Sequence, residues 1–115
     1  MNTTDDGARE KLTCNLPFDQ SNGRHLSAVE KLCERLAAEF GGYTCTPFVG
    51  GWRVADGSAL HEVGLAFDVS YAPSEAKRKA AKTLFIEAGA ACDQTDIHLE
   101  RSAFDAEHEK VSGGK

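Results

Sequence analysis

The fold is decided by residues 40–71, which read FGGYTCTPFVGGWRVADGSALHEVGLAFDVSY. The glycine pair near its start predicts the end of a helix, because glycine accepts the left-handed conformation of a C-terminal cap. Residues 43–49 are rich in β-branched and aromatic side chains, which favours a strand. Asp56-Gly57 is a strong hairpin signal. The alternation over residues 60–71 then predicts a long strand.

This last strand has two different faces. One is apolar and is predicted to pack on the core, while the other is polar or small and is predicted to stay open. In the preceding strand Pro47 predicts an edge position, because proline has no N–H to donate, and Gly50-Gly51 indicates a bulge or bend. The predicted buried face is Val63, Leu65, Phe67 and Val69, and the opposite face is Glu62, Gly64, Ala66 and Asp68.

The flanking sequence supplies the remaining elements. Residues 12–18 alternate as a first strand, and a capping box at Ser27 and Glu30 opens a helix with an apolar stripe. Residues 74–89 form a second helix that begins at a serine cap and ends at a glycine. Residues 96–101 alternate again as a fourth strand.

The order is β-α-β-β-α-β, which is the ferredoxin-like plan. We therefore predict an α+β two-layer sandwich: a four-stranded antiparallel sheet with two helices on one face. A length of 115 residues suits one core. We expect a single domain over residues 11–104, with flexible tails at residues 1–10 and 105–115.

Composition limits the function classes. The net charge of −5 argues against direct nucleic-acid binding and favours a basic protein partner. No apolar run approaches the ~20 residues of a membrane span, and the polar N-terminus lacks a signal-peptide pattern, so we expect a cytoplasmic protein. The four cysteines form no CxxC pair, which argues against a zinc ribbon or a thioredoxin motif and favours reduced thiols.

The series Gly41-Gly42-Tyr43-Thr44, Gly51-Trp52-Arg53, Gly57 and Glu62 resembles a pattern of small bacterial and phage proteins of unknown function. In these proteins a GG-aromatic-T…GxW…G…E pattern recurs between two ferredoxin-like halves. The resemblance covers about residues 12–71. It implies a compact α/β sandwich, often encoded by mobile elements, and transfers no catalytic residue. Small acidic phage proteins include inhibitors of host defence, such as anti-CRISPR proteins.

The open sheet face holds most of the candidate site residues. A histidine among carboxylates suits divalent-metal binding or general acid–base work, whereas a solvated sheet face is also simply polar. Small residues at its centre leave room for another surface, or reflect close backbone approach within the chain. Trp52 and Arg53 are either an exposed anchor or a cover for the core edge. The predicted face carries Asn15, Glu62, Gly64, Ala66, Asp68, Asp96, His98 and Glu100.

No motif for catalysis, a cofactor or a metal stands out in the sequence, so we expect none of these. The first hypothesis is a non-enzymatic protein-interaction module, in its concrete form a phage inhibitor of a host defence complex of the anti-CRISPR type. Its partner would be a basic surface of the host complex. One alternative is a small enzyme or metal-binding protein that uses Asp68, Asp96, His98 and Glu100. Another is a self-associating subunit, such as a homodimer.

Overall fold

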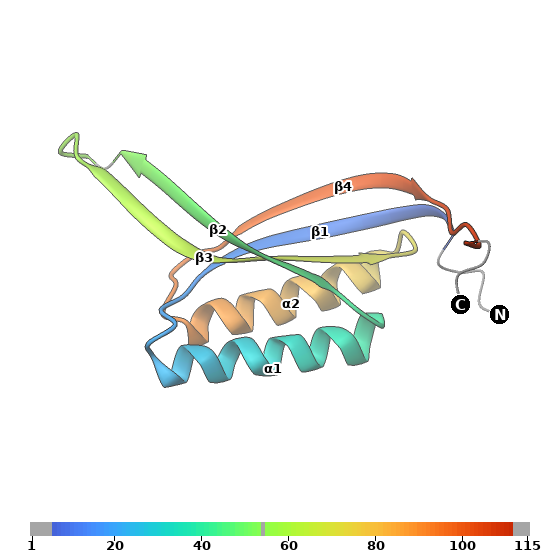
Figure 1. Cartoon of the computed structure of the whole chain (residues 1–115), viewed down its shortest axis with the longest axis horizontal. Coiled ribbons are helices and arrows are strands. Elements are labelled where there is room, and N and C mark those ends of the chain that lie inside the picture. Colours follow the sequence, from blue (N-terminus) through green and yellow to red (C-terminus); the bar gives the residue numbers. More distant parts are fainter. Residues whose placement is uncertain (1–5, 54, 112–115) are drawn as a thin grey trace.

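The computed structural model describes residues 6–53 and 55–111 and confirms the predicted sandwich, with two helices covering one face of a four-stranded antiparallel sheet (Figure 1). The sheet order is β2-β3-β1-β4, which is the order of the ferredoxin-like fold. Neither helix in this described part is long and apolar enough to cross a bilayer. The elements are β1 (Gly7–Pro17), α1 (Gly23–Phe40), β2 (Thr44–Arg53), β3 (Ala59–Tyr71), α2 (Glu75–Ala91) and β4 (His98–Ala106).

The core lies between the sheet and the helix layer. Alternate residues of β1 and β3 point toward the helices, and one apolar stripe of each helix closes over them. This burial is the main favourable term that holds the two layers together. The largest fully buried side chains are Phe67, Phe85, Leu16, Leu36, Val69, Cys14 and Cys92.

The start of α1 differs from the prediction. Asn22 is the N-cap, and its side chain accepts hydrogen bonds from two N–H groups of the first turn. The predicted capping box at Ser27 and Glu30 is therefore wrong, because both residues lie inside a helix that Asn22 has already capped. The predicted end is confirmed, since Gly41 adopts the left-handed conformation with φ 81°.

Helix α2 begins as predicted but ends later. The Ser74 side chain accepts from the Lys77 N–H, whereas Gly89, predicted to end the helix, lies within it. A Cβ atom at Gly89 would lie 2.6 Å from Cγ2 of Ile97. The glycine is therefore needed for the α2–β4 loop to pack closely against the helix, and not for a cap.

Both predicted tails contribute to the sheet. Strand β1 begins at Gly7, and Arg9 and Glu10 are buried, so the predicted tail over residues 1–10 is wrong from residue 7 onward. Strand β4 runs from His98 to Ala106, later than the predicted residues 96–101 and into the predicted tail at residues 105–115. The pairing of residues 7–15 of β1 with β4 extends both strands beyond the alternation that predicted them.

The hairpin of β2 and β3 extends past the helices as an arm (Figure 1); we use "the arm" for Phe48–Arg53 and Ala59–Val63. Its ladder passes through Gly50 and Gly51 with one-to-one pairing, so the predicted bulge is wrong. The predicted burial of Val63 is also wrong, since 59% of this residue is exposed. The alternation identified the correct face, but no helix reaches that end of the strand.

Candidate functional site

The open sheet face carries one row of paired polar side chains. Thr13 of β1 lies between Asp68 of β3 and Glu100 of β4. The Thr13 hydroxyl donates to the Asp68 carboxylate, and His98 Nε2 lies 2.7 Å from Glu100 Oε2. These two carboxylates therefore have separate partners.

The next row combines a small side chain, an amide and an imidazole. Asn15 lies between Ala66 and His98, and Ala66 is half-buried at the centre of the face. Packing within the chain requires a glycine at position 64, because a Cβ atom there would lie 2.3 Å from the carbonyl oxygen of Leu16. Close backbone approach thus explains this glycine without an external partner.

A groove of about 660 Å³ lies at the base of the arm, between the β2–β3 hairpin and the loop that precedes β4. It brings together four of the predicted residues, Asn15, Glu62, Asp96 and His98, whereas Asp68 and Glu100 lie outside it. Sequence reasoning missed Phe48, Gln94 and Thr95, because which side chains of β2 and of the loop before β4 come together depends on the tertiary structure. The groove is lined by Asn15, Pro17, Phe48, Val49, Gly50, Gly51, Glu62, Gln94, Thr95, Asp96, Ile97 and His98.

Glu62 is the distinctive titratable group of this groove. It is half-buried on β3, and burial raises the pKa of its carboxyl above the ordinary value. A carboxyl with a raised pKa keeps its proton to a higher pH than a fully exposed one does.

The structure divides the residues of the predicted metal or acid–base group. Asp68 pairs with Thr13, Glu100 pairs with His98, and Asp96 precedes β4. Among residues 6–53 and 55–111, no three His, Cys, Asp or Glu side chains are arranged to hold a metal ion. In the part of the chain that the structure describes, the predicted four therefore do not form a metal-binding cluster.

The two predicted anchor residues lie at the end of β2. The Arg53 guanidinium Nη1 donates to the carbonyl of Gly57 at 3.1 Å, so it closes the turn of the arm. The side chain of Trp52 lies outside the described part of the structure. Its backbone pairs with Leu60 of β3.

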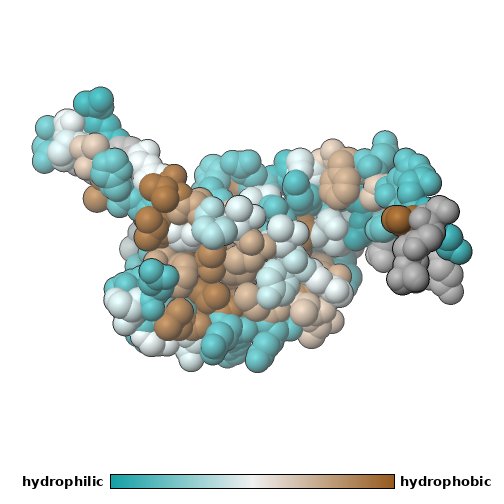
Figure 2. Space-filling model, in the orientation of Figure 1, coloured by the Kyte–Doolittle hydropathy of each residue, from teal (hydrophilic) through white to brown (hydrophobic). Residues whose placement is uncertain are grey.

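Exposed apolar side chains accumulate on the arm. Val49 and Val63 form a cross-strand pair on the helix side and are 77% and 59% exposed, and Leu60 on the other side is 46% exposed. Figure 2 shows apolar surface where the arm leaves the body. Sequence reasoning missed this surface, because Val63 carries the same alternation signal as the buried Val69.

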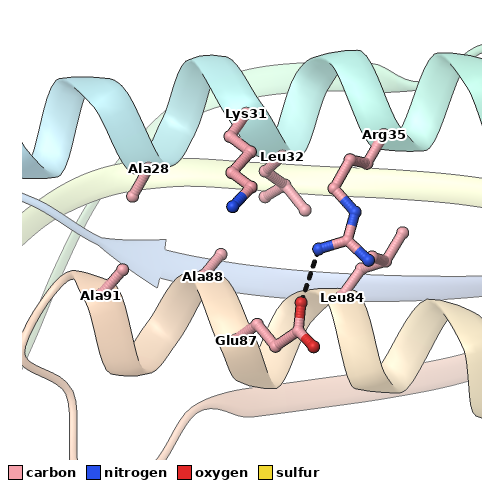
Figure 3. Close-up of a pocket in the computed structure, with 8 residues that line it drawn as sticks. All are labelled: Ala28, Lys31, Leu32, Arg35, Leu84, Glu87, Ala88 and Ala91. Atoms are coloured by element: carbon pink, nitrogen blue, oxygen red, sulfur yellow. Dashed lines mark hydrogen bonds and ion pairs between the residues drawn. The ribbon is translucent and has the colours of Figure 1, made fainter.

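The helix layer holds a different, smaller cavity of about 100 Å³ between α1 and α2. Alanine and leucine side chains form its floor, and Arg35 Nη1 reaches across to Glu87 Oε1 at 2.6 Å (Figure 3). The ion pair bridges the two helices over this cavity, so we interpret it as a packing feature of the helix layer.

No protein-family model and no curated sequence matches the chain. Solved structures share its fold at low identity. A Bacillus cereus protein related to NIF3 matches with a TM-score of 0.60 and 7% identity over 88% of this chain, which spans only 27% of that protein. The periplasmic divalent cation tolerance protein CutA of Archaeoglobus fulgidus matches with a TM-score of 0.57 and 13% identity, over 89% of this chain and 87% of that one. A phage SAM lyase in complex with S-methyl-5'-thioadenosine matches with a TM-score of 0.55 and 12% identity, over 91% and 94%. At these identities the likeness shows the fold.

Proposed function

We propose that this chain is a protein-interaction module whose docking element is the arm. The observation that carries the proposal is the exposed valine pair, Val49 and Val63, on a hairpin that projects from the body. Apolar side chains paired across two strands and left in water form a patch that another surface can bury. The concrete form is an inhibitor that docks on a host defence complex, as expected for phage proteins of this size and charge.

The experiment compares two single substitutions of exposed apolar residues. Val63→Glu places a charge on the arm, and Ile86→Glu, at a residue 50% exposed on α2, is the matched control. Purified variants serve as bait in host extract, with capture measured by quantitative mass spectrometry. We expect Val63→Glu to reduce capture of the partner at least tenfold, or about 1.4 kcal/mol. Equal capture by both variants would contradict an arm-centred interface.

A second candidate function, a small-ligand or enzymatic site, is supported by the groove. Its volume of about 660 Å³ lies within the ~300–1,000 Å³ typical of ligand pockets. The side chains of Phe48 and Ile97 offer apolar walls, and Asn15 and Glu62 offer an amide and a carboxyl. This mixture suits a nucleoside, the class of ligand held by the phage SAM lyase of the same fold.

The test uses S-methyl-5'-thioadenosine and adenosine as probes in isothermal titration calorimetry. For this second candidate we expect binding by the unmodified chain, weakened about tenfold by Asn15→Ala and Glu62→Gln. Asp68→Asn, on the same face but outside the groove, is the control and should bind as the unmodified chain does. Absence of heat with either nucleoside at millimolar concentration would remove this candidate.

A further inference from the structure

The two edges of the sheet differ in charge. Strand β4 forms one edge and carries Glu100, Arg101 and Asp105. Strand β2 forms the other edge, and its residues 44–52 hold no charged side chain. Long edge strands usually carry charges or are covered, because their unpaired N–H and C=O groups attract other strands. The edge of β2 has only Pro47 as a protecting residue.

The register shows which backbone groups of β2 point away from the sheet. The Phe18 N–H donates to the C=O of Val63, so the backbone groups of Val63 face away from β2. Val63 lies opposite Val49, which makes them a non-hydrogen-bonded pair with the Val49 groups directed outward. The backbone N–H and C=O groups of every second residue along β2 point outward in the same way. The outward groups of this segment therefore belong to Pro47, Val49, Gly51 and Arg53, of which Pro47 offers only its C=O.

The molecule also exposes more surface than a compact chain of its mass. Its accessible area is 7691 Å², whereas about 6,100 Å² is expected for a folded monomer of 12.4 kDa. The radius of gyration is 16.4 Å, against about 13 Å for a compact domain of this length.

We propose that the edge of β2 from Pro47 to Arg53 pairs antiparallel with the same edge of a second copy of this chain, forming a two-fold dimer with one continuous sheet. This inference rests on the proposed function, in which the arm is the docking element, and it identifies a second copy of this chain as a partner of the arm. With the two-fold axis at Gly50, Val49 lies opposite Gly51 of the second copy, and each exchanges both backbone hydrogen bonds with the other. The Arg53 N–H then meets the Pro47 C=O of the second copy.

Three features favour a second copy over a charged partner. The segment has no charge before Arg53 with which to select a basic or acidic strand, and an uncharged edge pairs with itself without like-charge repulsion. Gly50 would meet Gly50 of the second copy in a non-hydrogen-bonded pair, where Cα atoms approach to about 4.5 Å and small residues fit. Isologous pairing also closes the assembly, which limits further growth along the edge.

Light scattering coupled to size-exclusion chromatography, over a dilution series, tests the pairing. We expect the unmodified chain to reach twice its 12.4 kDa mass. Val49→Lys should raise the dissociation constant about tenfold or more, because a lysine protects an edge. Ala103→Lys, at an exposed residue of the β4 edge, is the matched control and should leave the dimer intact.

Amide hydrogen exchange measured by NMR supplies an independent readout. The amides of Val49, Gly51 and Arg53 should be protected at concentrations that favour the dimer and exchange faster in Val49→Lys.

A monomer at every concentration would overturn the inference, as would a dimer in which these amides stay unprotected. A mass above the dimer, or dissociation caused by Ala103→Lys, would overturn the two-fold pairing. A monomer whose partner capture still falls with Val63→Glu would leave the proposed function standing, whereas capture unaffected by Val63→Glu would contradict it.

Discussion

His25 Nε2 lies 2.9 Å from Asp93 Oδ2, which joins the first turn of α1 to the residue after the C-cap of α2. His25 Nδ1 accepts the N–H of Asp19 at 3.0 Å, so Nε2 carries the proton and donates to Asp93. Arg24 donates to both oxygens of the same carboxylate, at 3.0 and 2.8 Å. Asp93 itself has φ 64°, a conformation that aspartate and asparagine tolerate better than most residues.

This arrangement predicts a defined pH dependence for Asp93→Asn. The hydrogen bonds from Arg24, and next those from His25, lower the pKa of Asp93 below its ordinary value. A lowered pKa stabilises the fold above the unfolded-state pKa of about 3.9 and loses that contribution as pH falls further. At pH 7, urea unfolding should show that the unmodified chain is more stable than Asp93→Asn. The difference should shrink below about pH 4.

Asparagine keeps the shape and tolerates the positive φ, so the comparison isolates the charge. A difference that stays constant from pH 7 to below pH 3 would contradict this account of the cluster.

Two valines on the same face of β3 should respond differently to truncation. Val69 is 1% exposed and Val63 is 59% exposed. We expect Val69→Ala to lower the free energy of unfolding by about 2 kcal/mol and Val63→Ala by about 0.5 kcal/mol or less, because only the first removes core contacts. Equal losses in urea unfolding of the monomeric chain would show that the arm is packed in solution.

Gly64→Ala should destabilise the fold through a backbone clash. The added Cβ would lie 2.3 Å from the Leu16 carbonyl oxygen and 2.7 Å from Pro17 Cα. Neither atom belongs to a movable side chain, so we expect a loss of about 1–3 kcal/mol, measured by urea unfolding. Gly42→Ala is the control, since nothing lies within 4 Å of its added Cβ and its φ is not positive. A neutral Gly64→Ala would disprove the close approach of β1.

Arg78→Ala should cost more stability than its neighbour Lys79→Ala. The Arg78 guanidinium Nε donates to the Glu10 carboxylate at 3.1 Å, and Glu10 is only 7% exposed. Removing this partner leaves a buried carboxylate with Arg101, 3.4 Å away, as its remaining ion pair. We expect a loss of about 1.5–3 kcal/mol in thermal or urea unfolding.

The Lys79 side chain is exposed, so its removal should change stability by about 0.5 kcal/mol or less. Similar losses for the two variants would contradict a stabilising role for the Glu10 pair. The two neighbours differ in direction, because Arg78 faces the sheet while Lys79 faces solvent.

The sequence by itself determined the type and order of all six elements. Local signals carry this information: the Gly41 cap, the Asp56-Gly57 turn, the Ser74 cap and the alternation of β3 depend on residues close together in the chain.

Only the tertiary structure decided where those elements are covered. Val63 and Val69 give the same alternation signal. The helices cover Val69 but do not extend as far as Val63, so Val69 is buried and Val63 is exposed to water. The groove likewise depends on Ile97 packing against Gly89. Burial is a property of contacts between residues distant in sequence, so no local pattern specifies it.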